Sequence, residues 1–227
     1  MHTMIRWALG SLFVALPVLA AVPAVAAPTG VVVGKVSVKK PGGGESDPTG
    51  VVVYLESVPG SVPLEGDRPH PQVRQRDLQF SPSLTVVVVG TTVDFPNDDK
   101  VFHNVFSFSE AAKFDLGLYK SGTSKSVTFH RPGVISVYCN IHPEMISQIK
   151  VVDTVYYAVV GKDGTFRIDR VPPGNYPLVA WRAASPEVRQ ELSVAGGGTA
   201  MVKVELLAGV LDTRHLRKDG TPYGRYK

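Results

Sequence analysis

Three side chains that can bind a soft metal ion lie close together near the middle of the sequence. Cys139, His142 and Met145 have the spacing C-x2-H-x2-M and directly follow a predicted strand with the sequence GVISVYC. A thiolate, an imidazole and a thioether on one short loop suit copper far better than magnesium, calcium or manganese. Pro143 helps to fix the path of the loop. The loop is therefore a candidate metal site.

A fourth candidate ligand lies earlier in the sequence. His103 follows a predicted strand over residues 91–95 and a polar turn, residues 98–100, that we expect to be solvated. Two imidazoles, a thiolate and a weak axial methionine make up the blue-copper site, which transfers electrons. The other interpretation of Cys139, the single cysteine of the chain, is a small buried apolar side chain. A metal-bound thiolate is deprotonated and occupied, so it would not form a disulfide in an oxidising compartment.

The N-terminus has the pattern of an export signal. Residues 1–6 carry one positive charge, residues 7–22 are almost wholly apolar, and residues 24–26 (AVA) form a small-x-small cleavage site. This pattern predicts a signal peptide over residues 1–26 and a periplasmic location. The apolar run is too short for a membrane span, and no cysteine follows it to take a lipid. We therefore expect no integral membrane span after the signal is removed.

The net charge gives no support for nucleic acid or an anionic membrane as a partner. The sequence has 24 Lys and Arg against 20 Asp and Glu, a formal charge of +4 that falls by one when Arg6 leaves with the signal. Proteins that bind phosphate backbones carry denser positive charge on one face. We therefore expect no nucleic-acid partner.

The distribution of apolar segments predicts an all-β chain. Short valine-rich or alternating runs recur between Gly, Pro, Asn and Asp residues, which is typical of β-sandwiches and barrels. Residues 61–79 are proline-rich without a sustained apolar pattern and are predicted to be a linker. Residues 210–227 are predicted to be a basic C-terminal tail at the surface. The predicted strands are 31–38, 51–56, 84–89, 91–95, 124–129, 134–139, 146–152, 156–160, 165–169, 176–182 and 200–206.

Four sequence features occur in a fixed order between residues 80 and 152. They are FSPSLTVVVVGTTVDFPNDD, HNVFS, a strand entry with Val127, Phe129, Pro132 and Gly133, and VYCNIHPEMISQIKV. By these features the segment resembles the cupredoxins, and within them the plastocyanin-like and amicyanin-like branch. The short C-x2-H-x2-M loop is similar to that of amicyanin, and chains with this layout resemble proteins labelled methylamine-utilisation proteins. The resemblance implies a Greek-key β-sandwich.

The cupredoxin resemblance also implies the roles of several residues. His103, Cys139, His142 and Met145 would be the ligands of one type 1 copper ion. Asn104 would connect the two ligand loops and donate its backbone N–H toward the sulfur. No other cofactor is implied.

The same resemblance implies a surface for electron transfer. His142 would reach solvent through an apolar patch to which Ile141 and Pro143 contribute, and electrons would pass through its ring edge. The partners would be redox proteins, and encounters of this kind are small and weak. The sequence leaves the donor, the acceptor and the oligomeric state open.

The remaining histidines argue against an enzyme. His2, His70, His130 and His215 are far apart in the sequence and form no H-x-H pair or comparable cluster. A copper nitrite reductase or a multicopper oxidase needs a second copper site with several histidines, and a binuclear copper centre needs two cysteines. We therefore expect an electron carrier with no catalytic residues.

A further resemblance lies outside the cupredoxin-like segment. Residues 163–181 have the sequence DGTFRIDRVPPGNYPLVAW. Their pattern, DG-x-F…V-P-P-G-x-Y-x-L, resembles the transthyretin-like (prealbumin-like) or carboxypeptidase-regulatory β-sandwich. The strands with which that family begins resemble GVVVGKVSV and TGVVVYLES, which here precede the cupredoxin-like segment.

These positions predict a cupredoxin domain, residues 80–152, inserted into a discontinuous transthyretin-like domain formed by residues 28–60 and 153–209. The alternative is that the first two strands belong to the cupredoxin sheet and that the C-terminal module is separate. The second module could orient the copper domain, bind carbohydrate or stabilise the fold.

Two other functions compete with electron transfer. The chain could deliver or sense copper, or it could be a surface-binding β-sandwich that has lost its metal. The presence of all four candidate ligands argues against the last of these.

Overall fold

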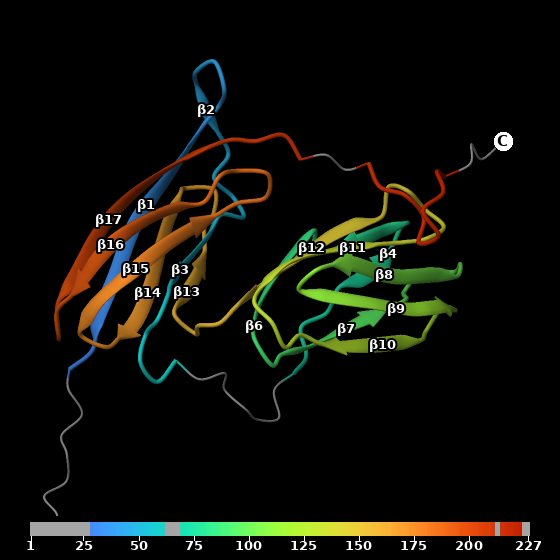
Figure 1. Cartoon of the computed structure of the whole chain (residues 1–227), viewed down its shortest axis with the longest axis horizontal. Coiled ribbons are helices and arrows are strands. Elements are labelled where there is room, and N and C mark those ends of the chain that lie inside the picture. Colours follow the sequence, from blue (N-terminus) through green and yellow to red (C-terminus); the bar gives the residue numbers. More distant parts are fainter. Residues whose placement is uncertain (1–27, 62–68, 212–213, 224–227) are drawn as a thin grey trace, which may run out of the picture.

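Two β-sandwiches lie side by side in the computed structural model, which describes residues 28–61, 69–211 and 214–223 (Figure 1). The described residues form strands and turns without a helix, so the prediction of an all-β chain is confirmed. Accordingly, this part of the chain offers no helix long and apolar enough to cross a bilayer. The predicted signal peptide, residues 1–26, lies outside the described residues.

The strands divide between two units that we name by their content. The ligand sandwich carries the candidate metal ligands and consists of β4 (Arg74–Arg76), β5 (Gln79–Ser81), β6 (Leu84–Val88), β7 (Thr92–Pro96), β8 (His103–Ser109), β9 (Ala112–Tyr119), β10 (Ser124–Thr128), β11 (Gly133–Tyr138) and β12 (Ile146–Val152). The second sandwich consists of β1 (Gly30–Lys39), β2 (Glu45–Ser46), β3 (Val52–Leu55), β13 (Tyr157–Val159), β14 (Thr165–Val171), β15 (Gly174–Trp181), β16 (Val188–Val194) and β17 (Thr199–Leu207).

Strands that are distant in the sequence build the second sandwich. β1 is parallel to β17 and antiparallel to β14, with β2 paired at its end. In the facing sheet, β3 lies between β13 and β15, and β16 follows at the edge. This pairing differs from the alternative in which the first strands join the cupredoxin sheet. The likeness of this unit to transthyretin-like domains stays a prediction.

Burial on both faces explains why β3 is a continuous apolar run. Val53 and Leu55 face the core between the two sheets of the second sandwich. Val52 and Tyr54 point the other way, into the contact with the ligand sandwich. A strand with one solvated face would alternate between apolar and polar residues. The sequence VVYL therefore reflects a strand that lies between two apolar layers.

The topology of the ligand sandwich brings its two ligand-bearing segments together. One sheet has the order β6-β12-β11-β8-β9, and the short pairs β10-β7 and β4-β5 lie opposite. β8 and β11 are antiparallel neighbours, with Tyr138 opposite Phe106. The start of β8 therefore lies beside the end of β11. His103 begins β8 and Cys139 follows β11, so both lie at the same end of the sandwich.

The ligand sandwich begins earlier in the sequence than predicted, within the expected linker. Val73 and Gln75 are fully buried, β4 pairs with β5, and Gln72 and Gln75 form bridges to the β7 segment. The last part of the predicted linker, residues 61–79, thus belongs to the ligand sandwich. A three-residue strand places only one side chain inward, which is too short for an alternating pattern in the sequence.

The C-terminal tail lies at the surface but is held against the ligand sandwich. The side chains of residues 214–223 are exposed or half-buried, and the segment lies beside the loop between β11 and β12 (Figure 1). The tail is rich in Lys, Arg and Gly, so its composition gave no apolar pattern from which docking could be predicted.

A buried lysine lies at the contact between the two sandwiches. Lys150, on β12, is only 5% exposed, and its ammonium lies 5.2 Å from the centroid of the Tyr54 ring and 5.0 Å from that of Trp181. The ammonium is 3.6 Å from the carboxylate of Glu187. Cation–π attraction and the carboxylate offset part of the cost of burying the charge. Apolar residues of both units surround it, so the contact between the sandwiches is closed and mainly apolar.

Replacing Lys150 should change how stability depends on pH. Burial lowers the pKa of Lys150 below its ordinary value of 10.5, although Glu187 and Glu56 act in the opposite direction and Arg189 adds to the lowering. Above the lowered pKa the folded chain holds fewer protons at this residue than the unfolded chain does. Between the lowered pKa and about pH 10.5, the free energy of unfolding of the native chain therefore rises with pH relative to that of the Lys150→Met variant.

Urea unfolding of both proteins between about pH 7 and the ordinary lysine pKa measures this difference. A difference in unfolding free energy that is constant across the range would contradict the lowered pKa of the buried Lys150.

Candidate metal centre

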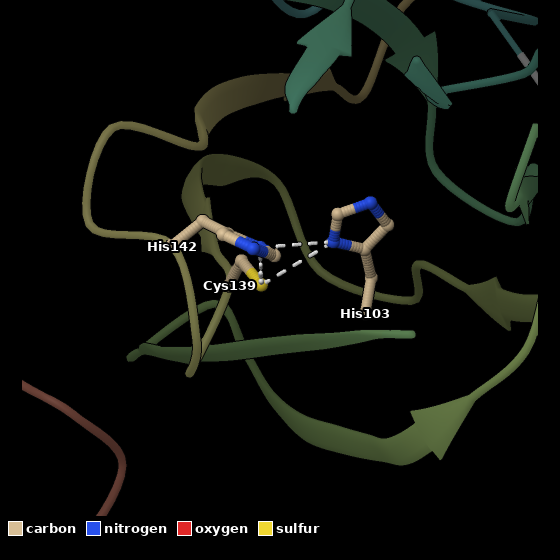
Figure 2. A group of neighbouring side chains, drawn as sticks. All are labelled: His103, Cys139 and His142. Atoms are coloured by element: carbon tan, nitrogen blue, oxygen red, sulfur yellow. Dashed lines mark hydrogen bonds between the residues drawn. The ribbon is translucent and has the colours of Figure 1, made fainter. Parts of the chain in front are cut away.

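Three possible ligand atoms converge at one end of the ligand sandwich (Figure 2). His103 Nδ1 lies 3.1 Å from His142 Nδ1 and 3.9 Å from Cys139 Sγ. His142 Nδ1 lies 3.7 Å from the same sulfur. Nitrogen and sulfur ligands that share one ion, each at roughly 2 Å from it, are separated by distances of this order. The structure therefore brings together three of the four predicted ligands.

The loop between β11 and β12 is closed by its own backbone. Cys139 N–H donates to the Met145 carbonyl over 3.3 Å, and Met145 N–H donates to the His142 carbonyl over 3.2 Å. Met145 is fully buried in the same apolar cluster as Cys139. The fourth predicted ligand is thus a buried thioether at the end of the same closed loop.

Asn97 shapes the loop that leads from β7 to His103. Its side-chain N–H groups donate to the carbonyls of Val101 (2.9 Å) and Tyr119 (3.1 Å). Its Oδ1 accepts the N–H of Asp99 at 3.0 Å. Asn97 is fully buried, so water does not compete for these bonds. They turn the loop so that Asp99 comes back toward His103.

Asp99 is a site residue that the sequence did not reveal. We expected residues 98–100 to be a solvated turn, but Asp99 Oδ2 lies 2.7 Å from His103 Nε2, and its side chain is 12% exposed. The carboxylate also accepts the backbone N–H groups of Asp77 (2.7 Å) and Leu78 (3.0 Å). A carboxylate that accepts from one ring nitrogen leaves the other nitrogen with a free lone pair. Asp99 thus orients His103 with Nδ1 available for a metal.

Several N–H groups surround the Cys139 sulfur. Burial raises the pKa of this thiol, but hydrogen bonds from His103 and from the backbone N–H groups of Asn104, Ile141 and His142 lower it below the ordinary value. Hydrogen bonds to the charged form favour that form. The loop is therefore built to hold a thiolate, which is the form of cysteine that binds metals.

The two imidazoles differ in their surroundings. Burial lowers the pKa of His103, but Cys139 and Asp99 together raise it above the ordinary value. For His142, burial and the nearby charge of His103 both lower the pKa. Metal binding needs neutral imidazoles and releases protons. The lowered pKa of His142 thus favours its neutral form, whereas the contacts of His103 with Cys139 and Asp99 act in the opposite direction.

Asn104 makes different contacts with its backbone and with its side chain. Its backbone N–H does point to the Cys139 sulfur. Its side chain, however, donates to Asp115 Oδ1 on β9 at 2.6 Å, and its Oδ1 is buried without a hydrogen-bond partner. The side chain therefore ties β8 to β9, whereas the backbone N–H is the group that links β8 to the cysteine on the second ligand loop.

The exposed apolar surface near the site includes residues that were not predicted. Ile141 and His142 are both half-buried, Pro143 is exposed, and Ile141 also packs against the core of the ligand sandwich. Val101 and Phe102, just before His103, are 45% and 54% exposed. Two large apolar residues within the polar segment DDKVFHN were the signal that sequence analysis missed.

One family model matches the part of the chain that holds this site. Residues 70–152 match the copper-binding plastocyanin/azurin family. The description of that family is "Copper binding proteins, plastocyanin/azurin family", and the match covers less than half of the chain. The match begins four residues before β4, the first strand of the ligand sandwich, and ends with β12. No curated protein matches the sequence.

Solved structures similar to part of this chain include the following three. A Cu-containing nitrite reductase (NirK) from Thermus scotoductus SA-01 is 24% identical with a TM-score of 0.37, over 41% of this chain and only 26% of the reductase. A purple cupredoxin from Nitrosopumilus maritimus is 28% identical with a TM-score of 0.33, over 36% of this chain and 99% of that protein. A point mutant of amicyanin with Cu(I) is 22% identical with a TM-score of 0.36, over 44% of this chain and 98% of amicyanin.

The chemistry of the donor set fits copper. A thiolate with two imidazoles and a thioether is a soft ligand set, and a carboxylate fixes one imidazole from outside. Hard ions such as magnesium and calcium prefer oxygen ligands, and the converging atoms include none. The family match and the donor set together support one copper ion.

Neutralising Asp99 should weaken copper binding. Without the negative carboxylate that accepts its Nε2–H, His103 becomes a poorer ligand and its orientation is less fixed. We expect Asp99→Asn to lower the copper affinity about ten-fold or more, as measured by competition with a chelator of known affinity.

Asp98→Asn is the matched control for this experiment. Asp98 is the neighbouring carboxylate, but it bonds to Arg74 (2.7 Å) and Arg76 (3.3 Å) at the surface. It should bind copper as the native protein does. Equal affinities for both variants would show that Asp99 has no influence on the site.

Proposed function

We propose that the chain is an exported electron carrier that holds one copper ion through His103, Cys139, His142 and Met145. The observation that carries the proposal is that the possible ligand atoms of one cysteine and two histidines lie within 4.8 Å of one another at one end of a β-sandwich. The match of residues 70–152 to a copper-binding family supports the choice of metal.

Each of the four side chains has a distinct part in this proposal. A copper ion held here would take up and release single electrons. Cys139 supplies a thiolate, stabilised by the N–H groups around it, and His103 and His142 supply neutral nitrogen donors. Met145 supplies a weaker thioether donor. The closed backbone of the loop and the bond from His103 to Asp99 keep these groups in place when the charge at the site changes.

The burial of the site separates the ligands from water except at one residue. His103, Cys139 and Met145 are fully buried, whereas His142 is half-buried. Water therefore has little access to the thiolate. Among the four proposed ligands, His142 offers the shortest route between the site and a partner, in line with the expectation from the cupredoxin resemblance.

Exposed apolar side chains beside both ligand segments support a docking surface for redox partners. Phe102 and Val101 precede His103, and Pro143 follows His142. Exposed apolar groups next to the ligands in the chain suit brief contact with another protein. The periplasm would be the place of these encounters if the predicted signal over residues 1–26 directs export.

Two substitutions at the site test the ligand set. Cys139→Ser should abolish the intense visible absorption of the copper-loaded protein, because that absorption requires a thiolate-to-copper bond. Met145→Leu should leave copper bound but raise the reduction potential, since the axial donor stabilises the oxidised state. Optical spectra and redox titration measure both effects. A serine variant that keeps the colour would remove Cys139 from the site.

A substitution at the surface tests electron transfer itself. Phe102→Glu should slow electron self-exchange by about ten-fold, because the negative charges of the two introduced glutamates would have to meet at this surface. NMR line broadening in mixtures of oxidised and reduced protein gives the rate without a known partner.

Phe108→Glu is the control for the surface experiment. Phe108 is 56% exposed at the opposite end of β8, and its replacement should leave the rate unchanged. Slow exchange in the native protein, combined with ready release of copper, would favour copper delivery over electron transfer.

A further inference from the structure

The C-terminal segment contacts three consecutive residues at the end of β11. The ring of His215 stacks on the ring of Tyr138, with centroids 4.2 Å apart and planes inclined by 20°. The hydroxyl of Tyr223 lies 2.5 Å from the carbonyl oxygen of Cys139. The backbone N–H of Lys218 donates to Asn140 Oδ1 at 2.8 Å. The segment therefore contacts the cysteine ligand and both of its neighbours.

The direction of each hydrogen bond around Tyr223 follows from its partners. The Cys139 carbonyl can only accept, so the single proton of the Tyr223 hydroxyl points to it. His215 Nε2 lies 2.9 Å from the same hydroxyl and must then donate its N–H to the hydroxyl oxygen. The chain of donors runs from His215 through Tyr223 to the backbone of the cysteine ligand.

The same segment reaches the other side of the sulfur through Lys218. The Lys218 ammonium lies 2.7 Å from Asp115 Oδ2, and Asp115 Oδ1 accepts from the Asn104 side chain at 2.6 Å. Asn104 in turn directs its backbone N–H to Cys139 Sγ. The C-terminal segment thus contacts the loop that carries Cys139 directly and is connected to Asn104 through Asp115.

We propose that residues 214–223 form a strap that positions the cysteine ligand, with Tyr223 as its principal positioning residue. The hydroxyl fixes the peptide group after Cys139, and this peptide leads into the turn whose N–H groups, from Ile141 and His142, point at the sulfur. The strap therefore sets how strongly those N–H groups bond to the thiolate. The function of the strap does not require a partner protein or a change of protonation.

The strap should influence the electronic properties of the bound metal, and this part of the inference rests on the proposed function. N–H groups draw electron density from the thiolate, and the hydrogen bonding around the cysteine sulfur tunes the potential of such sites. A looser turn weakens these bonds and leaves more electron density on sulfur. The oxidised state then gains stability, so the reduction potential falls.

The first test uses the metal-free protein. Cys139 is fully buried, so iodoacetamide reaches it only when the segment opens. Tyr223→Phe removes one hydrogen bond that holds the segment closed, which should speed alkylation about five-fold. Mass spectrometry of the whole chain gives the rate, and thermal unfolding shows that the fold is retained.

Tyr176→Phe is the matched control. Tyr176 also donates its hydroxyl to a backbone carbonyl, that of Pro172 at 3.1 Å, but it lies in the second sandwich. This variant should alkylate at the native rate.

The second test uses the copper-loaded protein. Tyr223→Phe should shift the visible absorption band and lower the reduction potential, while Tyr176→Phe should change neither. Faster alkylation of the Tyr223 variant in a protein that develops no colour with copper would support the strap and overturn the proposed function. A native alkylation rate together with an unchanged band and potential would overturn the strap.

Discussion

The site depends on keeping a negative sulfur inside an apolar sandwich. A buried anion is costly unless donors and opposite charge surround it. Here the compensation comes from three backbone N–H groups and His103, while Asp99 holds His103 in turn. These groups belong to two different loops, so the thiolate is stabilised only when the whole end of the ligand sandwich is folded. The requirement explains why buried polar residues such as Asn97 and Asn104 cluster at this end rather than at the other.

The surrounding structure restricts how far these groups can move. Asn97 fixes one ligand loop, backbone bonds close the other, and β8 and β11 hold the two at a constant separation. β12, which follows the second loop directly, is buried against the second sandwich through Lys150 and its aromatic neighbours. The metal site is thus connected through one strand to the contact between the two units.

The part of the site that is local in sequence could be predicted, and the part that depends on long-range contacts could not. The spacing of Cys139, His142 and Met145 on one loop is visible in the sequence, and the alternation of apolar residues indicates the strands. Asp99 looked like a solvated turn residue because its role comes from the fold of the preceding loop around Asn97. Tyr223 lies 84 residues from the carbonyl that it contacts, in a segment without apolar pattern. Neither contact leaves a periodic signal.

The neighbouring positions of β3 and β13 have a mechanical consequence. Tyr54 lies opposite Tyr157, so the chain leaves the second sandwich and returns to it at adjacent strands of one sheet. The ligand sandwich is consequently joined to the second sandwich by two covalent connections that start from adjacent strands, and the segment after β17 contacts it through hydrogen bonds. Two connections at one point would by themselves permit rotation like a hinge. The apolar contact around Lys150 and the hydrogen bonds of the C-terminal segment oppose such a rotation, so the orientation of the histidine-bearing end depends on these non-covalent contacts.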